Sequence, residues 1–263
     1  MIFAALYADN ALDYLIYVVF TLVAVVIAMV LHEYAHGLVA KWNGDYTAKY
    51  SGRLTLNPLK HFDPIGFVMM MLVGFGYAKP VPINPGNFRK FRRGLFTVSI
   101  AGICMNLILA LLFALLICLM GLGMVLTDSE IGVNVMFYFA RFFIVNMRLN
   151  LSLAFFNLLP IYPLDGFRIV ECLTRRGNKF CAFMRTNGQY ILFGLVGLHF
   201  IVSMAMNYFP QIPNWFAYID ILGTYMSYCT YYVGLGFTLF WSLMMPPLRE
   251  VFNAVWILLM GSI

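Results

Sequence analysis

The stretch VVIAMVLHEYAHGLVAKW, residues 25–42, decides the fold and also carries chemically reactive side chains. Its first residues belong to a charge-free run: residues 14–31 contain no Asp, Glu, Lys or Arg. A membrane-spanning helix needs about 20 consecutive apolar residues. The stretch therefore predicts a transmembrane helix near residues 13–41, with two histidines and a glutamate inside the membrane.

The whole chain has the composition of a membrane protein. Of its 263 residues, 62% are hydrophobic and 11% are charged, whereas a soluble domain contains about 25% charged residues. This polar content is too small to cover a globule, which excludes an ordinary soluble enzyme, a disordered protein and a nucleic-acid-binding protein. The net charge of +6 favours loops that face an anionic cytoplasmic leaflet. The five cysteines are widely spaced and predict neither a disulfide framework nor a thiolate metal site.

Other charge-free runs locate the remaining spans. They predict helices near residues 95–126, 140–160, 188–209 and 219–245. The apolar stretch 251–263 is too short for a full span and is expected to form an interfacial or partial helix, and residues 131–140 are interpreted as another interfacial piece. The predicted fold class is an all-α polytopic membrane protein with about five to six transmembrane helices.

The basic residues are distributed unevenly among the loops. Three loops are rich in Lys and Arg: residues 41–60, 79–93 and 171–187. The loop 127–133 contains acidic residues and no basic one. The positive-inside rule therefore places the three basic loops in the cytoplasm and the acidic loop on the opposite side.

An apolar segment between two of the basic loops is a special case. Residues 64–78 are apolar, yet a full span there would place one basic flank outside. We therefore expect residues 64–90 to form a re-entrant loop, which Pro80, Pro82 and Pro85 make extended rather than helical. Non-helical backbone at membrane depth is tolerated where it is buried in protein or lines an aqueous cavity.

The predicted first span carries the pattern H-E-x-x-H at residues 32–36. Positions i and i+4 share one helix face, so His32 and His36 can hold one Zn²⁺ while Glu33 reaches a water at the metal. Ionisable residues in a membrane helix are costly and usually functional. His32 precedes Lys41 by nine residues, which places the site about 13 Å below the cytoplasmic surface.

A catalytic zinc needs a third protein ligand, with one position left for water. The remaining histidines and carboxylates offer several candidates: His61, Asp63, His199 and Asp165. Asp165, in FNLLPIYPLDGFR (156–168), is the best of them, because Pro160 and Pro163 break the preceding helix and Gly166 permits a tight turn. The alternative is an ordinary ion pair between Asp165 and Arg168.

Together, HEYAH and NLLPIYPLDG (157–166) resemble the site-2 protease family of intramembrane zinc metalloproteases. Three further segments agree: GRLTLNPLKHFDPIG (52–66) is similar to the segment after the zinc helix, AKPVPINP (78–85) to the re-entrant loop, and SIAGICMN (99–106) to an A-G-P-x-x-N element. The departure is Ile103, which stands where proline is usual. The resemblance covers roughly residues 15–170.

The resemblance implies a site and a reaction. His32, His36 and Asp165 would hold one Zn²⁺ per chain, Glu33 would act as the acid/base, and Asn106 and Asn157 would bind the substrate or the developing oxyanion. Interhelical hydrogen bonds are the alternative role of the two asparagines. The implied substrate is a single-span membrane protein or a signal-peptide remnant, cleaved in regulated intramembrane proteolysis.

The resemblance also implies an organisation and a location. We expect one membrane domain over residues 1–263, with a catalytic core at 13–170 and additional C-terminal helices at 188–263. The chain leaves no room for a PDZ or CBS domain, so control is expected from a membrane partner or from the substrate. The expected location is the plasma membrane of a prokaryote, with the site toward the cytoplasm.

Two other functions remain open at this stage. A metal transporter could use the His/Asp site to pass Zn²⁺, although a transporter favours internal repeats, of which the sequence shows none. A catalytically inactive homologue is the other alternative, against which the intact H-E-x-x-H and LDG motifs argue. A prenyl-protein type of membrane zinc protease would share only the first motif.

Overall fold

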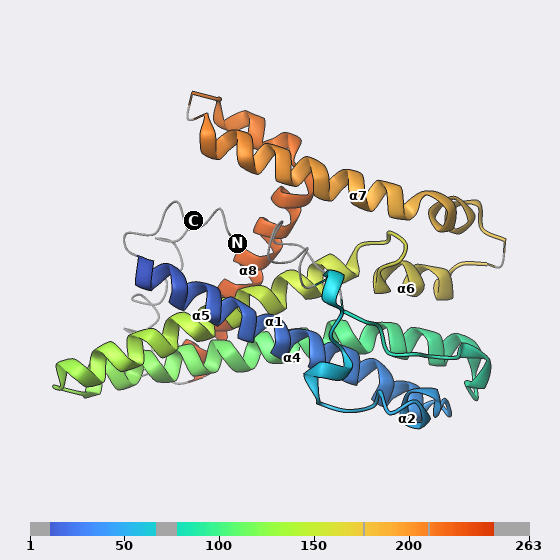
Figure 1. The fold of residues 1–263 in the computed structure, drawn as a ribbon, viewed down its shortest axis with the longest axis horizontal. Helices are drawn as coiled ribbons and strands as arrows, with labels where there is room; N and C mark the ends of the chain where they lie inside the picture. The colour runs from blue at the N-terminus through green and yellow to red at the C-terminus, as the bar shows by residue number, and fades with distance from the viewer. Residues whose placement is uncertain (1–10, 67–77, 176, 210, 245–263) are drawn as a thin grey trace.

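The computed structural model describes residues 11–66, 78–175, 177–209 and 211–244 (Figure 1). Within these ranges the regular structure is helical throughout, which confirms the all-α fold class. The α-helices are α1 (Ala11–Trp42), α2 (Thr47–Tyr50), α4 (Phe91–Leu126), α5 (Glu130–Leu158), α6 (Asp165–Leu173), α7 (Lys179–Tyr208) and α8 (Ile221–Met244). Three short 3₁₀ turns lie between them: η2 (Pro58–Lys60), η3 (Pro85–Asn87) and η4 (Asn214–Ile219).

Four of the described helices are long and apolar enough to cross a membrane: α1, α4, α5 and α7. The 24-residue α8 lies where a fifth span is predicted. With α8 included, the described residues contain five of the five to six predicted spans. The predicted C-terminal segment 251–263 lies outside the described residues.

The start of α5 differs from the prediction. Residues 131–140 are not a separate interfacial piece, because α5 runs without interruption from Glu130. Its first turn is capped by Ser129, whose side chain accepts a hydrogen bond from the backbone N–H of Gly132. Similarly, α7 begins nine residues before the predicted apolar span, where the Asn178 side chain accepts a hydrogen bond from the N–H of Phe180.

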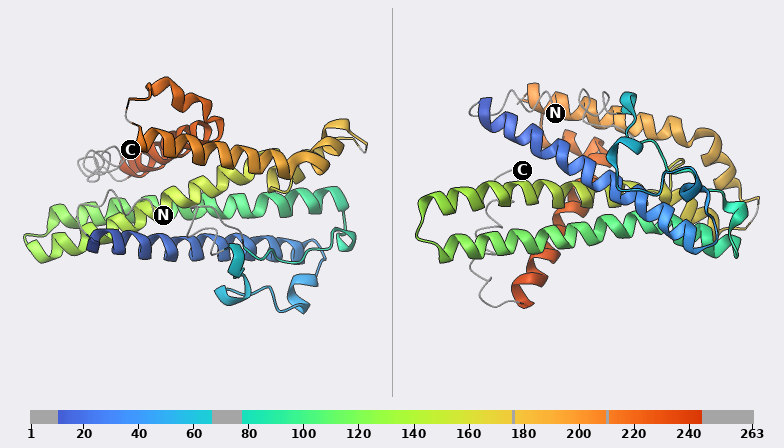
Figure 2. Two further views of the ribbon diagram at one scale, coloured as in Figure 1. Left: turned by 45° about the horizontal axis from the view of Figure 1, so that its top comes forward. Right: turned by 60° about the horizontal axis from the view of Figure 1, so that its bottom comes forward.

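The antiparallel helices α4 and α5 form the centre of the bundle, and α1 packs against both (Figures 1 and 2). The core between α4 and α5 includes Phe113, Ile117, Met147 and Leu151, all of them buried. The helix α8 packs on α4 and α5, whereas α7 contacts α8 and α6. The end of α1, the start of α4 and the α6–α7 link lie at one end of the bundle, opposite the α4–α5 turn (Figure 1). This is the arrangement that the basic and acidic loops predict.

The segment before α4 is extended, as the prolines predict. Residues 78–84 carry no regular secondary structure and lead into the 3₁₀ turn η3. The backbone N–H of Lys79 donates to the carbonyl of His61 at 3.0 Å. Residues 67–77 lie outside the described ranges, so the re-entrant course of this loop stays a prediction, as does the division into a catalytic core and C-terminal helices.

The α5 helix ends before Pro160 and Pro163, as the sequence predicts. Helix α5 ends at Leu158, and α6 begins at Asp165, which places this carboxylate in the first turn of a new helix. Gly166 is needed for close approach rather than for an unusual backbone conformation. A Cβ atom at position 166 would lie 2.2 Å from the carbonyl oxygen of Leu158. The glycine therefore allows the start of α6 to pack directly on the end of α5.

Candidate metal centre

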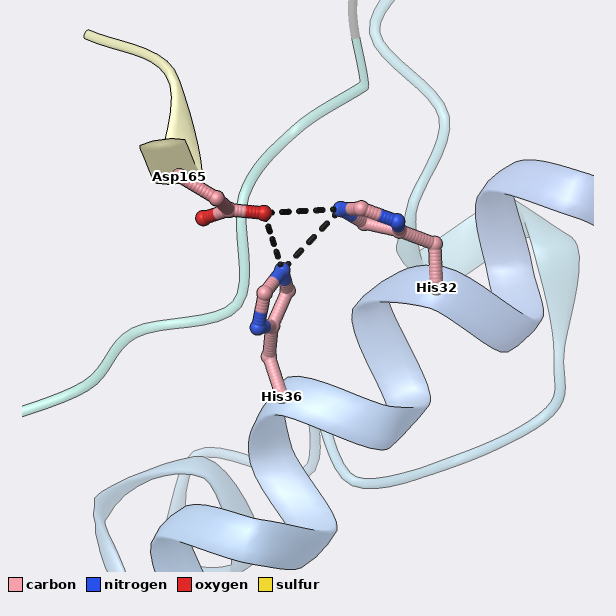
Figure 3. A group of neighbouring side chains, drawn as sticks. All are labelled: His32, His36 and Asp165. Atoms are coloured by element: carbon pink, nitrogen blue, oxygen red, sulfur yellow. Dashed lines mark hydrogen bonds and ion pairs between the residues drawn. The ribbon is translucent and has the colours of Figure 1, made fainter. Parts of the chain in front are cut away.

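Three predicted ligands come together between α1 and α6 (Figure 3). His32 and His36 lie one turn apart on α1, and their Nε2 atoms are 3.0 Å apart. The Oδ2 atom of Asp165 is 3.3 Å from His32 Nε2 and 3.0 Å from His36 Nε2. All three residues are at most 8% exposed. The site therefore offers two imidazole nitrogens and one carboxylate oxygen directed at a common point.

The donor set fits a tetrahedral zinc ion. With metal–ligand bonds of about 2.0–2.1 Å, a tetrahedral ion places its donor atoms roughly 3.3 Å apart. The three distances between Nε2, Nε2 and Oδ2 are 3.0, 3.0 and 3.3 Å. Asp165 Oδ2 is buried and makes no hydrogen bond to any described residue. A buried carboxylate oxygen without a hydrogen-bond donor is costly unless a cation compensates it.

The hydrogen bond on the far side of His36 fixes its tautomer. His36 Nδ1 lies 2.7 Å from the carbonyl oxygen of Val98 on α4. Because a carbonyl only accepts, Nδ1 must donate, which leaves the Nε2 lone pair of the neutral ring directed at the site. Histidine ligands of metals are commonly oriented by such a hydrogen bond.

Gly102 on α4 forms the wall of the site. A Cβ atom at position 102 would lie 2.4 Å from His32 Cε1 and 2.5 Å from His36 Nε2. Any side chain there would displace both imidazoles. The glycine therefore lets the backbone of α4 lie directly against the two histidine rings. The packing of α1 on α4 depends on this glycine.

Substitution Gly102→Ala is expected to weaken zinc binding by at least about tenfold, because both imidazoles must move from their positions. Zinc per chain, measured by mass spectrometry after a chelator challenge, checks this expectation. Gly197→Ala is the matched control, because a Cβ atom at position 197 in α7 meets nothing within 4 Å. Equal zinc retention in the two variants would contradict the role of Gly102 as the wall of the site.

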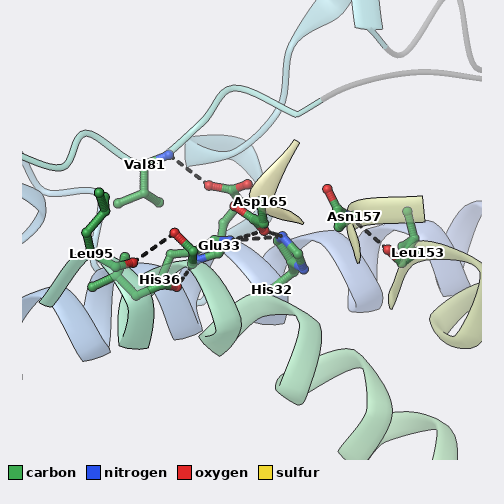
Figure 4. Close-up of polar contacts among 10 residues, drawn as sticks. His32, Glu33, His36, Val81, Leu95, Leu153, Asn157 and Asp165 are labelled. Carbon is green, nitrogen blue, oxygen red and sulfur yellow. Dashed lines mark hydrogen bonds and ion pairs between the residues drawn. The ribbon is translucent and has the colours of Figure 1, made fainter. Parts of the chain in front are cut away.

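Glu33 is adjacent to the triad and is held by the extended segment (Figure 4). Its Oε2 atom accepts a hydrogen bond from the backbone N–H of Val81 at 2.8 Å. Glu33 is partly exposed, unlike the two histidines. One carboxylate oxygen is thus fixed by the backbone, and the other has no hydrogen-bond partner among the residues that the structure describes.

The segment that holds Glu33 is fixed on both sides of Val81. On one side, the Arg53 guanidinium donates to the carbonyl oxygens of Lys79, at 2.6 Å, and Pro80. On the other side, the fully buried carboxylate of Asp45 accepts from the N–H of Asn84 at 2.7 Å and from the Asn87 side chain at 2.9 Å. Asp45 thus ties the chain after α1 to the start of α4.

Hydrogen bonding keeps Asp45 ionised. Burial opposes its negative charge, but hydrogen bonds from Thr47, Asn87 and Asn84 outweigh it, so the pKa of Asp45 lies below its ordinary value. The stability that this charge contributes is therefore present at neutral pH. It is lost only as the pH falls through the lowered pKa.

Substitution Asp45→Asn is expected to lower the cleavage rate about 10- to 100-fold without removing zinc. The amide cannot accept every hydrogen bond of the carboxylate, so the segment at Val81 loses its anchor and Glu33 loses its fixed orientation. Turnover and zinc content of the same purified sample check both halves of the expectation. The control is Asp128→Asn, an exposed acid in the α4–α5 turn. Loss of zinc in parallel with turnover would indicate general unfolding instead.

The two predicted asparagines are placed differently. Asn106 is fully buried on α4, one helical turn after Gly102, and neither its side-chain nitrogen nor its oxygen has a hydrogen-bond partner among the described residues. Asn157 on α5 is half-buried and donates to the carbonyl oxygen of Leu153 on its own helix (Figure 4). The amide of Asn106 is therefore unpartnered among the described residues, whereas the Asn157 amide already donates one N–H to its own helix.

The other candidates for the third ligand are engaged elsewhere. His61 donates from Nε2 to the carbonyl oxygen of Thr55, and Asp63 accepts from the N–H groups that follow it. His199 on α7 is hydrogen-bonded to Asp220, with its Nδ1 2.6 Å from Asp220 Oδ2. The described ranges contain no ion pair between Asp165 and Arg168.

Comparison with known proteins relates the chain to zinc metalloproteases. The sequence pattern of peptidase family M50 matches residues 123–198. "Putative zinc metalloprotease YwhC" of Bacillus subtilis is 45% identical over 162 residues, which cover 61% of this chain and 71% of that relative. "Putative zinc metalloprotease Rip2" of Mycolicibacterium smegmatis is 28% identical over 224 residues, which cover 82% of this chain and 78% of that relative. No solved structure matches the chain significantly. The chain therefore belongs to peptidase family M50, the site-2 protease family whose motifs its sequence resembles.

Proposed function

We propose that this integral membrane metalloprotease is an intramembrane endopeptidase, which hydrolyses peptide bonds within or near the transmembrane segments of other membrane proteins. The observation that carries the proposal is the position of the donor triad. His32 and His36 lie within the long apolar helix α1, ten and six residues before its end at Trp42, and Asp165 faces them from α6. This position within an apolar helix supports a site at membrane depth.

The residues divide the chemical work between them. One zinc ion held by His32, His36 and Asp165 would supply Lewis-acid chemistry, polarising the scissile carbonyl and favouring deprotonation of water. Glu33 accepts the proton of the attacking water on its free oxygen and later delivers it to the leaving amine. The Val81 N–H keeps the other oxygen of Glu33 in place during both transfers.

Asn106 is the best-placed group to bind the substrate carbonyl. Its buried amide has two N–H donors and, among the described residues, no partner. Such a donor gains most when negative charge develops on an oxygen in front of it. Asn157 would contribute less, because one of its two N–H donors is already used by Leu153.

The substrate class follows from the location of the site. A transmembrane helix hides its carbonyls in backbone hydrogen bonds, so a substrate helix must unwind before cleavage. A single-span protein or a signal-peptide remnant suits this requirement, and a membrane partner would control access in regulated intramembrane proteolysis. The basic loops at the site's end of the bundle favour a cytoplasmic orientation in the plasma membrane of a prokaryote.

A reconstituted cleavage assay tests the proposal. The purified chain and a tagged single-span substrate are placed together in liposomes, and mass spectrometry locates the cut. We expect a cut within the substrate span or at its edge, lost after treatment with a zinc chelator and recovered with added Zn²⁺. A substrate with additional leucines in its span, which stabilise the helix, should be cleaved more slowly.

Two controls make the result decisive. Glu33→Gln serves as the inactive enzyme, and a soluble peptide with the same cut sequence shows whether the membrane matters. Cleavage confined to the soluble flanks, or equal cleavage of the soluble peptide, would contradict intramembrane action while leaving the metalloprotease class intact.

A further inference from the structure

A cavity lies close to the metal centre, at the end of the bundle where the basic loops gather, and Val98, whose carbonyl bonds His36, lines it. Its volume is about 700 Å³, and its walls come from the first turns of α4 and α7, from α6, and from the extended segment before α4. The lining includes four arginines: Arg92, Arg168, Arg175 and Arg185. Glu171 is the one acidic residue among the described lining residues.

The charges of this arginine pocket are largely uncompensated. Arg185 forms an ion pair with Glu171. Among the described residues, the guanidinium groups of Arg92, Arg168 and Arg175 make no ion pair or hydrogen bond to protein. Arg168 is notable, because both acids of α6 are engaged elsewhere: Asp165 faces the two histidines, and Glu171 pairs with Arg185. Three positive groups thus face one space without a protein partner.

The pocket lies at the boundary between a span and its loop. Arg92 lies two residues before the charge-free run 94–127, and Arg185 lies directly before the run 186–219. Side chains at such positions are at the level of lipid head groups when the helices cross a membrane. The start of α4, helix α6 and the start of α7 lie at this end of the bundle (Figures 1 and 2).

Apolar side chains accompany the arginines. Leu95, Val98 and Ile83 form part of the lining, and Phe91 lines it while 51% exposed. Two neighbouring aromatic side chains at the start of α7, Phe180 and Phe183, are 41% and 53% exposed. A ligand that carries both a phosphate and hydrocarbon chains matches this combination better than a fully polar anion does.

We propose that the arginine pocket binds the head group of an anionic phospholipid. Arginine guanidinium groups bind phosphate oxygens in a bidentate manner, and basic pockets between helices at the cytoplasmic side recognise anionic head groups. The positive ends of the α4 and α7 helix dipoles add to the attraction for an anion. The bound lipid would bridge α4, α6 and α7 next to the carbonyl of Val98, which orients His36.

Native mass spectrometry of the purified full chain tests this proposal. The detergent-solubilised protein is titrated with phosphatidylglycerol and, separately, with phosphatidylcholine. The pocket variant is Arg92→Gln/Arg168→Gln/Arg175→Gln. The control variant, Lys49→Gln/Lys60→Gln/Arg93→Gln, removes the same charge from exposed residues outside the pocket lining. Bound zinc and elution as a single species verify that both variants are folded.

We expect the pocket variant to bind phosphatidylglycerol at least about tenfold more weakly, whereas the control stays within about threefold of the unmodified chain. A second variant tests whether a more positive arginine pocket binds phosphatidylglycerol more tightly. Glu171→Gln removes the one described acid in the lining and frees Arg185, so it should bind phosphatidylglycerol more tightly. Damage to the fold would not produce this gain.

Two outcomes overturn the proposal. Equal loss of phosphatidylglycerol in the pocket and control variants would indicate diffuse attraction to the basic surface rather than a site. Titration with inorganic phosphate and ATP tests the alternative source of phosphate. If these anions bind through the same arginines, and phosphatidylglycerol binds no more tightly than phosphatidylcholine, the ligand is a soluble anion. All readouts are binding, so the result is independent of the proposed proteolysis.

Discussion

Substitution Glu33→Gln is expected to slow peptide-bond hydrolysis by about 10²–10⁴-fold, the contribution of proton transfer by a positioned acid/base. Glutamine has the size of glutamate and can still accept the hydrogen bond from the Val81 N–H through its amide oxygen. It cannot take a proton from water at neutral pH. The variant should therefore retain its fold and its zinc while losing turnover.

Product formation in liposomes and zinc per chain, measured on the same preparation, check this prediction. The matched control is Glu130→Gln, an exposed acid in the first turn of α5. Equal product from the Glu33 variant and the unmodified chain would show that another group is the acid/base. Loss of zinc in the Glu33 variant would show that the side chain supports the metal rather than the proton transfer.

The ligand triad could be predicted from sequence because its signals are local. The spacing of His32 and His36 is a helical repeat, and Pro160 and Pro163 mark the helix break that presents Asp165. Each signal needs only neighbouring residues to be interpreted. The structure adds that the two local features, 129 positions apart, meet between α1 and α6.

The residues that support the triad could not be predicted, because their roles exist only in the packed helices. The backbone of Val81 and the carbonyl of Val98 act through peptide groups, which have no side-chain signature. Gly102 matters because α4 passes against two imidazoles. Asp45 gave no signal beyond one acid in a basic loop, yet it is fully buried and anchors the segment that holds Glu33.

The helix starts were mispredicted for a different reason. Charge-free runs show where a chain can lie in hydrocarbon, whereas a helix begins at its cap. The cap of α5 is Ser129, and the cap of α7 is Asn178, each outside the apolar run. Both helices therefore extend beyond the predicted spans, and the extension of α7 carries Arg185 into the arginine pocket.

Substitution Asp165→Ala is expected to weaken zinc binding at least about 100-fold and to abolish turnover. It removes the only carboxylate among the three donors, so the two imidazoles must hold the ion without an anionic ligand. Asp165→Asn should be intermediate, because the amide oxygen keeps the donor position but lacks the negative charge. The order of zinc affinity is therefore aspartate, then asparagine, then alanine.

Competition with a chromophoric chelator gives the zinc affinity of each variant, and Co²⁺ substitution reports the ligand geometry by visible absorption. Asp63→Asn is the control, because Asp63 is another carboxylate near the end of η2 and accepts only backbone hydrogen bonds from Ile65 and Gly66. The assignment fails if Asp63→Asn loses zinc while Asp165→Ala keeps it. If both variants keep zinc but Asp165→Ala loses turnover, Asp165 acts on the substrate rather than on the metal, since a ligand cannot be removed without a change in metal affinity.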